Sequence, residues 1–267
     1  MTPHPLRPLC LPLAWSVAAI AAGCAPHASG SEAQSFGSAT LCADGYLLAV
    51  APERVGALSW QAGSALSSAP PHTHDLPRLS DDPERRLRFG GRIVSGPGGS
   101  GAGDVVLEWG EDFDAVRRNI MRVAQAADRP GRAALARIDA LSALSVPRTA
   151  PRILYLTRSG GSAGAGTYVD AAIRMAGGRN AAVGAGWHTP DIETLLLSEP
   201  DMVLTSFFGS DYHGVADRSV RHGALRDFID RHPRIDIPGR LWPCAGPGLV
   251  DATQRIHAAV MDWDANR

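Results

Sequence analysis

One segment of the chain has the residue spacing of a catalytic serine. Residues 160 to 164 read Gly-Gly-Ser-Ala-Gly, which matches G-x-S-x-G, the turn that presents the nucleophile of α/β-hydrolases. In those enzymes the serine follows its strand directly, whereas here small residues separate Thr157, the expected strand end, from Ser162. Asp251 and His257 stand in the chain order of a triad, but both fall in a predicted helix. A secreted serine hydrolase that uses Ser162 therefore stays as an alternative function.

The same glycines do not match a nucleotide-binding loop. Gly161 and Gly166 have P-loop spacing, but Thr167 stands where the phosphate-binding lysine belongs, and the sequence contains no lysine. Val169 replaces the last glycine of a dinucleotide fingerprint. What remains is a loop whose backbone can approach a ligand, before a helix that starts at Thr167 and whose N-terminus favours anionic groups.

Two histidines could contribute to a metal site. His72 and His74 lie one residue apart, and Asp75 follows them, a combination that can supply part of a ligand set. No other His, Cys or Asp motif has matching spacing, so a solvated loop is the simpler interpretation. A periplasmic metal-ion binder that uses His72 and His74 is a third hypothesis, and we otherwise expect no metal centre and no resident cofactor.

The N-terminus has the composition of an export signal. A basic start, the apolar run from Leu9 to Ile20 and small residues before Cys24 predict a signal peptide over residues 1–23. Ala-Ala-Gly-Cys resembles a lipobox, so we expect Cys24 to be acylated and to anchor a periplasmic protein to the membrane. Residues 24–38 are rich in Ala, Ser and Gly and predict a flexible tether.

The net charge and the cysteine content limit the classes of function that fit the chain. The net charge is −1 and the pI is about 6.7, so no basic field indicates nucleic-acid binding. After export, Cys42 and Cys244 remain in an oxidising compartment that permits a disulfide. Two buried thiols are the alternative, because spacing along the chain cannot show whether the two cysteines meet.

Strands alternate with helices along the mature chain, which predicts an α/β protein with parallel sheets. We expect an N-terminal lobe over residues 39–127, a linking helix within 128–147 and a C-terminal lobe over 148–267. In the first lobe, a strand is predicted at 104–109 and a helix at 114–127, where apolar residues recur at spacings of three and four. In the second lobe, strands at 153–157 and 202–208 flank helices that start near Thr167 and Thr189. A last strand is predicted at Arg240–Trp242, before a helix over Leu249–Trp263.

Aromatic residues make up 6% of the chain, and several follow predicted strands. The aromatics at or beyond strand ends are Trp60, Trp187, Phe207, Phe208, Tyr212 and Trp242. Loops at the carboxyl ends of parallel strands hold ligands in open α/β proteins. Aromatic side chains there suit a large, partly planar ligand.

Seven segments in this order resemble the substrate-binding proteins of ABC importers for iron complexes and cobalamin. They are LCADGYLLAV, RVGALS, EDFDAVRRNI, RSGGSAGAGT, AGGRN, DIETLLLSEPDMVL and LWPCAGP. The resemblance implies two Rossmann-like lobes joined by a long helix, with a ligand cleft between them. It implies a monomer without catalysis that delivers a siderophore, heme or cobalamin to a permease.

The resemblance also implies roles for individual residues. The ligand would contact Trp60, Arg158, Ser159, Trp187, Phe207 and Trp242. Glu84 and Glu193, each ahead of a strand, would dock onto the permease. The segment from Arg92 to Trp109 is compressed relative to this family, so one helix of the first lobe is expected to be missing.

Overall fold

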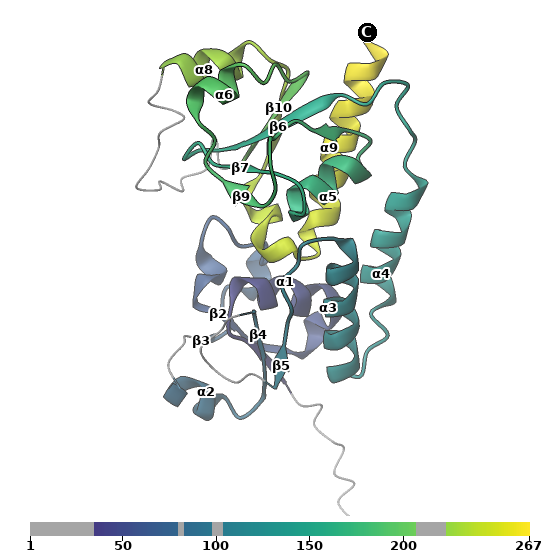
Figure 1. The fold of residues 1–267 in the computed structure, drawn as a ribbon. Helices are drawn as coiled ribbons and strands as arrows, with labels where there is room; N and C mark the ends of the chain where they lie inside the picture. The colour runs from purple at the N-terminus through teal and green to yellow at the C-terminus, as the bar shows by residue number, and fades with distance from the viewer. Residues whose placement is uncertain (1–34, 80–82, 98–103, 207–222) are drawn as a thin grey trace, which may run out of the picture. The chain divides into compact units, whose positions relative to one another are not determined.

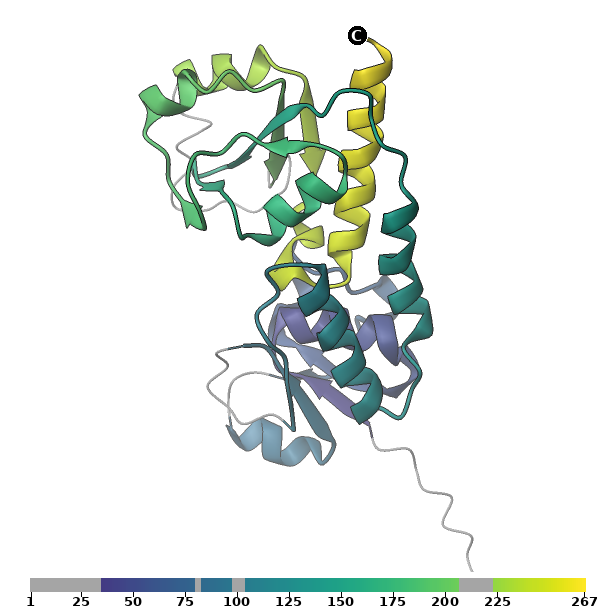
Figure 2. The ribbon, with the colours of Figure 1, turned by 45° about the vertical axis from the view of Figure 1, so that its right-hand side comes forward.

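The structure is a computed structural model that describes residues 35–79, 83–97, 104–206 and 223–267 (Figure 1). The signal peptide, Cys24 and Phe207 lie outside these residues. All described residues belong to one compact unit. Within it, two α/β lobes follow each other along the chain, and α4 (Arg132–Asp139) and α9 (Gly248–Ala265) run along one side of them (Figures 1 and 2).

The first lobe has a parallel sheet in the order β3-β2-β1-β4-β5. Its strands are β1 (Phe36–Ser38), β2 (Val55–Ser59), β3 (Arg78–Leu79), β4 (Arg92–Ser95) and β5 (Val105–Val106). Its helices are α1 (Leu41–Val50), α2 (Pro83–Phe89) and α3 (Phe113–Ala126). Single turns of 3-10 helix occur at η1 (Pro52–Arg54), η2 (Trp60–Gly63) and η3 (Pro71–Thr73). Thr40 and Asp112 cap α1 and α3 by accepting backbone N–H bonds, as short polar side chains do at helix starts.

The central strand β1 lies in the segment expected to be a tether, so the predicted tether is too long. Phe36 is fully buried, and a side chain on Gly37 would lie 2.5 Å from Leu79. The strand is only three residues long and contains a glycine, so it lacks the apolar alternation that identifies strands in a sequence. The lobe therefore begins at β1 rather than at residue 39.

The linking helix lies within the predicted segment, residues 128–147. It consists of α4 (Arg132–Asp139) and the 3-10 turn η4 (Ala140–Ala143). Asp128 and Gly131 have φ angles of +50° and +58°, a left-handed backbone that a right-handed helix cannot include. The helix therefore starts only after this turn. Arg137 in α4 pairs with Asp251 in α9 at 2.6 Å, so the link also contacts the second lobe.

The second lobe has a parallel sheet in the order β11-β10-β6-β8 and a separate antiparallel ribbon of β7 and β9. The strands are β6 (Arg152–Thr157), β7 (Ser162–Ala163), β8 (Arg179–Asn180), β9 (Trp187–His188), β10 (Met202–Ser206) and β11 (Arg234–Ile237). The helices are α5 (Tyr168–Met175), α6 (Ile192–Leu196), α8 (Gly223–Asp230) and α9 (Gly248–Ala265), with 3-10 turns η5 (Gly239–Leu241) and η6 (Pro243–Ala245).

The predicted strand at Arg240–Trp242 is wrong. Those residues belong to η5 and the turn after it, and the edge strand is β11. In β11, Ile235 and Ile237 are buried while the residues between them are exposed, which is the period-two pattern of a strand. Pro238 and Gly239 then end the strand.

One apolar core runs through both lobes. Phe36 and Leu47 of the first lobe belong to the same buried cluster as Tyr155 and Leu249 of the second. A wide opening of the lobes would expose this shared core, so the lobes are held more firmly than two domains with a polar interface. Across the described part of the chain, no helix has the length and apolar content to cross a membrane.

Candidate ligand-binding cleft

A cavity of about 370 Å³ lies between residues of the two lobes. Its walls are Trp109, Gly110 and Glu111 from the first lobe and Gly166, Thr167, Tyr168, Gly186, Trp187 and Cys244 from the second. Trp109 and Trp187 are 65% and 51% exposed, which is unusual for such large apolar rings. The structure thus offers two indoles, one from each lobe, to a molecule in this cleft.

Asn119 fixes the turn that carries Trp109. The Asn119 side chain accepts from the backbone N–H of Glu108 (2.9 Å) and donates to the carbonyl oxygen of Glu108 (3.0 Å). Asn119 is 1% exposed and lies in α3. Because Asn119 itself is buried, its two bonds anchor the turn after β5 firmly.

The Gly-rich segment is not the open loop that we predicted. Gly164 donates to the carbonyl of Gly186, and Ala165 and Gly186 complete a ribbon that continues β7 and β9. A side chain on Gly164 would lie 2.4 Å from the carbonyl oxygen of Gly184, so this close approach requires glycine. Some backbone N–H groups of this segment, which we expected to face a ligand, instead form the ribbon hydrogen bonds that position Trp187.

Trp187 rests on three aromatic rings, of which Tyr155 and Trp242 are buried and Tyr168 is partly buried. Its ring centroid lies 5.1 Å from that of Tyr168 and 6.1 Å from that of Tyr155. Tyr155 and Tyr168 in turn contact Trp242 at 5.9 and 6.0 Å. These tilted and edge-to-face contacts stabilise the rings beyond simple burial.

The prediction that Trp242 contacts a ligand is therefore wrong in this structure. Trp242 is 2% exposed, and Tyr155 and Tyr168 pack against it. The sequence places Trp242 just after a supposed strand end, but η5 turns its ring into the core. Its role is to support the tyrosines beneath the cleft.

Burial keeps the cleft tyrosines protonated. Burial raises the pKa of Tyr155 to about 12, although Ser206, whose hydroxyl lies 2.7 Å from that of Tyr155, offsets part of the shift. Burial, followed by the proximity of Tyr155, raises the pKa of Tyr168 still further above its usual range. At neutral pH both side chains are therefore uncharged phenols.

Three other predicted contacts lie elsewhere among the described residues. Trp60 begins η2 and is 61% exposed, but it is not one of the residues that line the cavity. Arg158 and Ser159 lie in the turn after β6, where the Ser159 and Thr157 hydroxyls are 3.0 Å apart. Their roles remain predictions.

Ser162 has no catalytic geometry. It is 2% exposed, and its hydroxyl donates a 2.8 Å hydrogen bond to the carbonyl of Tyr155. The partners that the sequence offered for Ser162 both lie in α9 and are engaged elsewhere. Asp251 pairs with Arg137 at 2.6 Å, and the His257 ring nitrogens lie 3.1 Å from the carbonyl oxygen of Ala176 and 3.2 Å from the Ser145 hydroxyl.

The histidine hypothesis also lacks geometric support. His72 and His74 are exposed, at and just after η3. Within the described ranges, no group of three or more His, Cys, Asp or Glu side chains could hold a metal ion.

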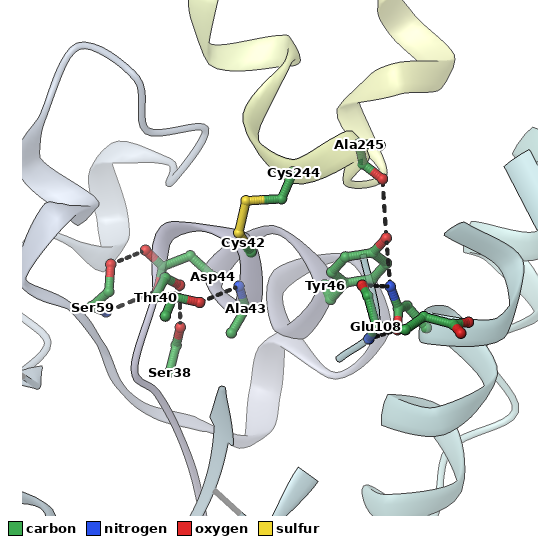
Figure 3. The surroundings of a disulfide bond; sticks show 11 residues. Ser38, Thr40, Cys42, Ala43, Asp44, Tyr46, Ser59, Glu108, Cys244 and Ala245 are labelled. Atoms are coloured by element: carbon green, nitrogen blue, oxygen red, sulfur yellow. Dashed lines mark hydrogen bonds between the residues drawn. A yellow bond between two sulfur atoms is a disulfide. The ribbon is translucent and has the colours of Figure 1, made fainter. Parts of the chain in front are cut away.

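Cys42 and Cys244 form a disulfide in the structure, with Cα atoms 5.5 Å apart (Figure 3). Cys42 lies in α1 and Cys244 in η6, so the bond joins the two lobes. Glu84 in α2 and Glu193 in α6 are both exposed, and these two helices lie on the side away from α4 (Figures 1 and 2).

Sequence reasoning missed three cavity residues: Trp109, Glu111 and Tyr168. Trp109 was assigned to a strand, although the strand ends at Val106. The signal was present, because Trp109-Gly110-Glu111 follows a predicted strand and precedes the cap of α3. Tyr168 was hidden at the first position of a helix whose other residues are mostly buried.

Solved structures share this fold. The heme-binding protein HutB of Vibrio cholerae is 20% identical, with a TM-score of 0.67 over 84% of this chain and 98% of that one. RhuT of Roseiflexus sp. RS-1, also heme-binding, is 19% identical, with a TM-score of 0.62 over 85% and 99%. The vitamin B12-binding protein BtuF of Vibrio cholerae is 15% identical, with a TM-score of 0.57 over 86% and 97%.

These similarities establish the architecture: two α/β lobes arranged as in periplasmic binding proteins. No protein-family model and no curated protein matches the sequence. The particular ligand must therefore be argued from the cleft.

Proposed function

We propose that this protein is the periplasmic solute-binding component of an ABC importer and captures an iron chelate, such as heme or a siderophore, or cobalamin. The observation that carries the proposal is that Trp109 and Trp187, from different lobes, line one cavity. Proteins of this fold include heme binders and a vitamin B12 binder. Such a protein binds without catalysis, so Ser162 would take no chemical part.

The cleft favours a ligand held largely by ring contacts. Indole faces and the Tyr168 ring supply apolar, polarisable surface for a planar macrocycle. A heme or corrinoid would stack its ring system on Trp187 and on the Tyr168 ring.

Delivery would follow the route that the sequence resemblance implies. Exposed Glu84 and Glu193 would pair with basic groups of a permease, one from each lobe. Acylated Cys24 would keep the monomer at the membrane, with residues before β1 as the tether. Trp60, Arg158, Ser159 and Phe207 would add further ligand contacts.

Tryptophan-fluorescence titration with hemin, a ferric hydroxamate siderophore and cyanocobalamin tests the proposal. We expect one of these compounds to quench the fluorescence saturably, with one molecule bound per chain. Trp187→Phe should lose a large part of the quenching. Trp263→Phe is the matched control, because the Trp263 ring lies in α9 and instead packs under Arg267 (4.8 Å to the ring centroid). Failure of all three compounds to bind would reject the ligand class.

A further inference from the structure

The disulfide ends at the wall of the cleft. Cys244 lines the cavity, while Cys42, its partner, lies in the first turn of α1 in the other lobe. The two residues are 202 positions apart in sequence. A bond whose only effect was to strengthen one lobe would not need to cross between lobes at the ligand site.

The backbone at this bond has an uncommon conformation. Cys244 and Ala245 have φ angles of +55° and +48°, and two successive non-glycine residues in the left-handed region are unfavourable. Tyr46, also in α1, donates a 3.0 Å buried hydrogen bond to the carbonyl of Ala245 (Figure 3). Helix α1 thus holds both residues, one by a covalent bond and one by a hydrogen bond.

The Trp109 turn lies directly against these two residues. A side chain on Gly110 would come within 2.6 Å of the Cys244 carbonyl oxygen and 2.8 Å of the Ala245 Cβ. Gly110 stands between Trp109 and Glu111, and all three line the cavity. Any shift of Cys244 must therefore move the turn or open a gap beneath it.

Tyr46 is also linked to the Trp109 turn through Asn119. Asn119 binds Glu108 through two backbone bonds, and its amide nitrogen lies 3.4 Å from the Tyr46 hydroxyl. Tyr46 therefore contacts both the residue that anchors the turn and the strained segment below it. Burial raises the pKa of Tyr46 to about 12, so its proton is available to the Ala245 carbonyl at all ordinary pH values.

We infer that Cys244, held by Cys42, is a positioning residue that sets Trp109 for ligand binding across the cleft. The inference deepens the proposed function and rests on it for the ligand. Oxidation in the periplasm completes the site by fixing the strained segment under the turn. Pre-organisation of this kind acts mainly by slowing ligand release.

The first test needs no ligand. Hydrogen exchange is measured on the oxidised protein, on the protein reduced with tris(2-carboxyethyl)phosphine, and on Cys42→Ser/Cys244→Ser. We expect faster exchange at residues 108–111 after reduction, with β10 unchanged. The double variant should resemble the reduced protein and should not respond to the reductant. Equal exchange at 108–111 in both redox states would overturn the inference, whether or not any ligand binds.

Tyr46→Phe keeps the test decisive if loss of the disulfide unfolds the chain. This variant retains the disulfide and the ring but loses the hydrogen bond to Ala245. We expect faster exchange at 108–111 and a changed Trp109 contribution to the fluorescence, taken as the difference from Trp109→Phe. A change spread equally over α1 and β1 would indicate a general stabilising role and would overturn the inference.

The second test uses whichever of hemin and cyanocobalamin binds. Reduction of the wild-type protein should raise the rate of ligand dissociation about tenfold, equivalent to roughly 1.4 kcal/mol. The rate for Cys42→Ser/Cys244→Ser should not change when the reductant is added. An unchanged rate in the reduced, folded protein would overturn the inference. Absence of binding by these two compounds and by the ferric siderophore would count against the proposed function instead, and the exchange result would still decide the positioning role.

Discussion

The Tyr168 and Trp187 rings meet at a centroid distance of 5.1 Å, with their planes tilted by 57°. Tyr168 begins α5 and Trp187 belongs to the β7–β9 ribbon, so the contact joins two elements at one wall of the cleft. Tyr155 and Trp242 support this pair from below. Trp187 is therefore held in place at the cavity while about half of its surface stays exposed.

Removal of the disulfide should lower stability. Cys42→Ser/Cys244→Ser should reduce the free energy of unfolding by about 2–4 kcal/mol, because the bond closes a long loop in the unfolded chain. Urea denaturation of the oxidised protein, the reduced protein and the variant measures the loss. Equal midpoints for all three would show that the bond does not form in the protein.

Replacement of Asp44 should change how stability depends on pH. Asp44 is 1% exposed and accepts from the Ser59 backbone N–H at 2.8 Å and from the Ser59 hydroxyl at 2.6 Å. Burial raises the pKa of Asp44 above its ordinary value of 3.8 despite these bonds. A carboxyl group whose pKa is raised in the folded protein stabilises the fold below pH 3.8. This contribution is lost as the pH rises through the pKa of the group in the folded protein.

Asp44→Asn has the same shape and lacks this titration. The free energy of unfolding of the variant, relative to that of the wild type, should therefore increase as the pH rises from about 3 towards 7. The increase reflects the titration of one carboxyl group. Thermal unfolding at several pH values measures the difference. A constant difference across the range would contradict the raised pKa.

Asp264 should show the opposite pH dependence. Its carboxylate accepts from the backbone N–H groups of Arg148 (2.9 Å) and Thr149 (3.1 Å), and tethers the end of α9 to the segment before β6. The Arg148 backbone N–H, assisted by its guanidinium, lowers the pKa of Asp264. Asp264→Asn should destabilise at neutral pH, and the difference should shrink as the pH falls below 3.8 through the folded pKa. A loss of stability in the variant that stays the same at acidic pH would contradict the lowered pKa of Asp264.

Ser162→Ala should leave the protein without any functional defect. The Ser162 hydroxyl is used in a buried bond to Tyr155, so its loss should cost about 1 kcal/mol of stability. Ligand affinity and any turnover of p-nitrophenyl esters should be the same in variant and wild type. Ester hydrolysis that disappears in the variant would support the hydrolase alternative.

The sequence was most informative where elements are long or clearly capped. Helix α3 was predicted to within one residue because its apolar residues repeat at spacings of three and four. Strand β1 was missed because three residues are too few to show a period. The cleft was harder to predict, because Trp109 and Trp187 line one cavity only through packing of lobes that are separate in sequence. Trp242 shows the converse error, since an aromatic near a strand end can equally turn inward.

The measurement that tests the central claim most directly is the dissociation constant of the tightest-binding compound in four proteins and one control. The four are the wild type, Trp109→Ala, Trp187→Ala and Trp109→Ala/Trp187→Ala, and Trp263→Ala is the control. If both indoles contact one ligand across the cleft, each single change should weaken binding about tenfold or more, roughly 1.4 kcal/mol or above. Wild-type affinity in either single variant would contradict a site shared by the two lobes.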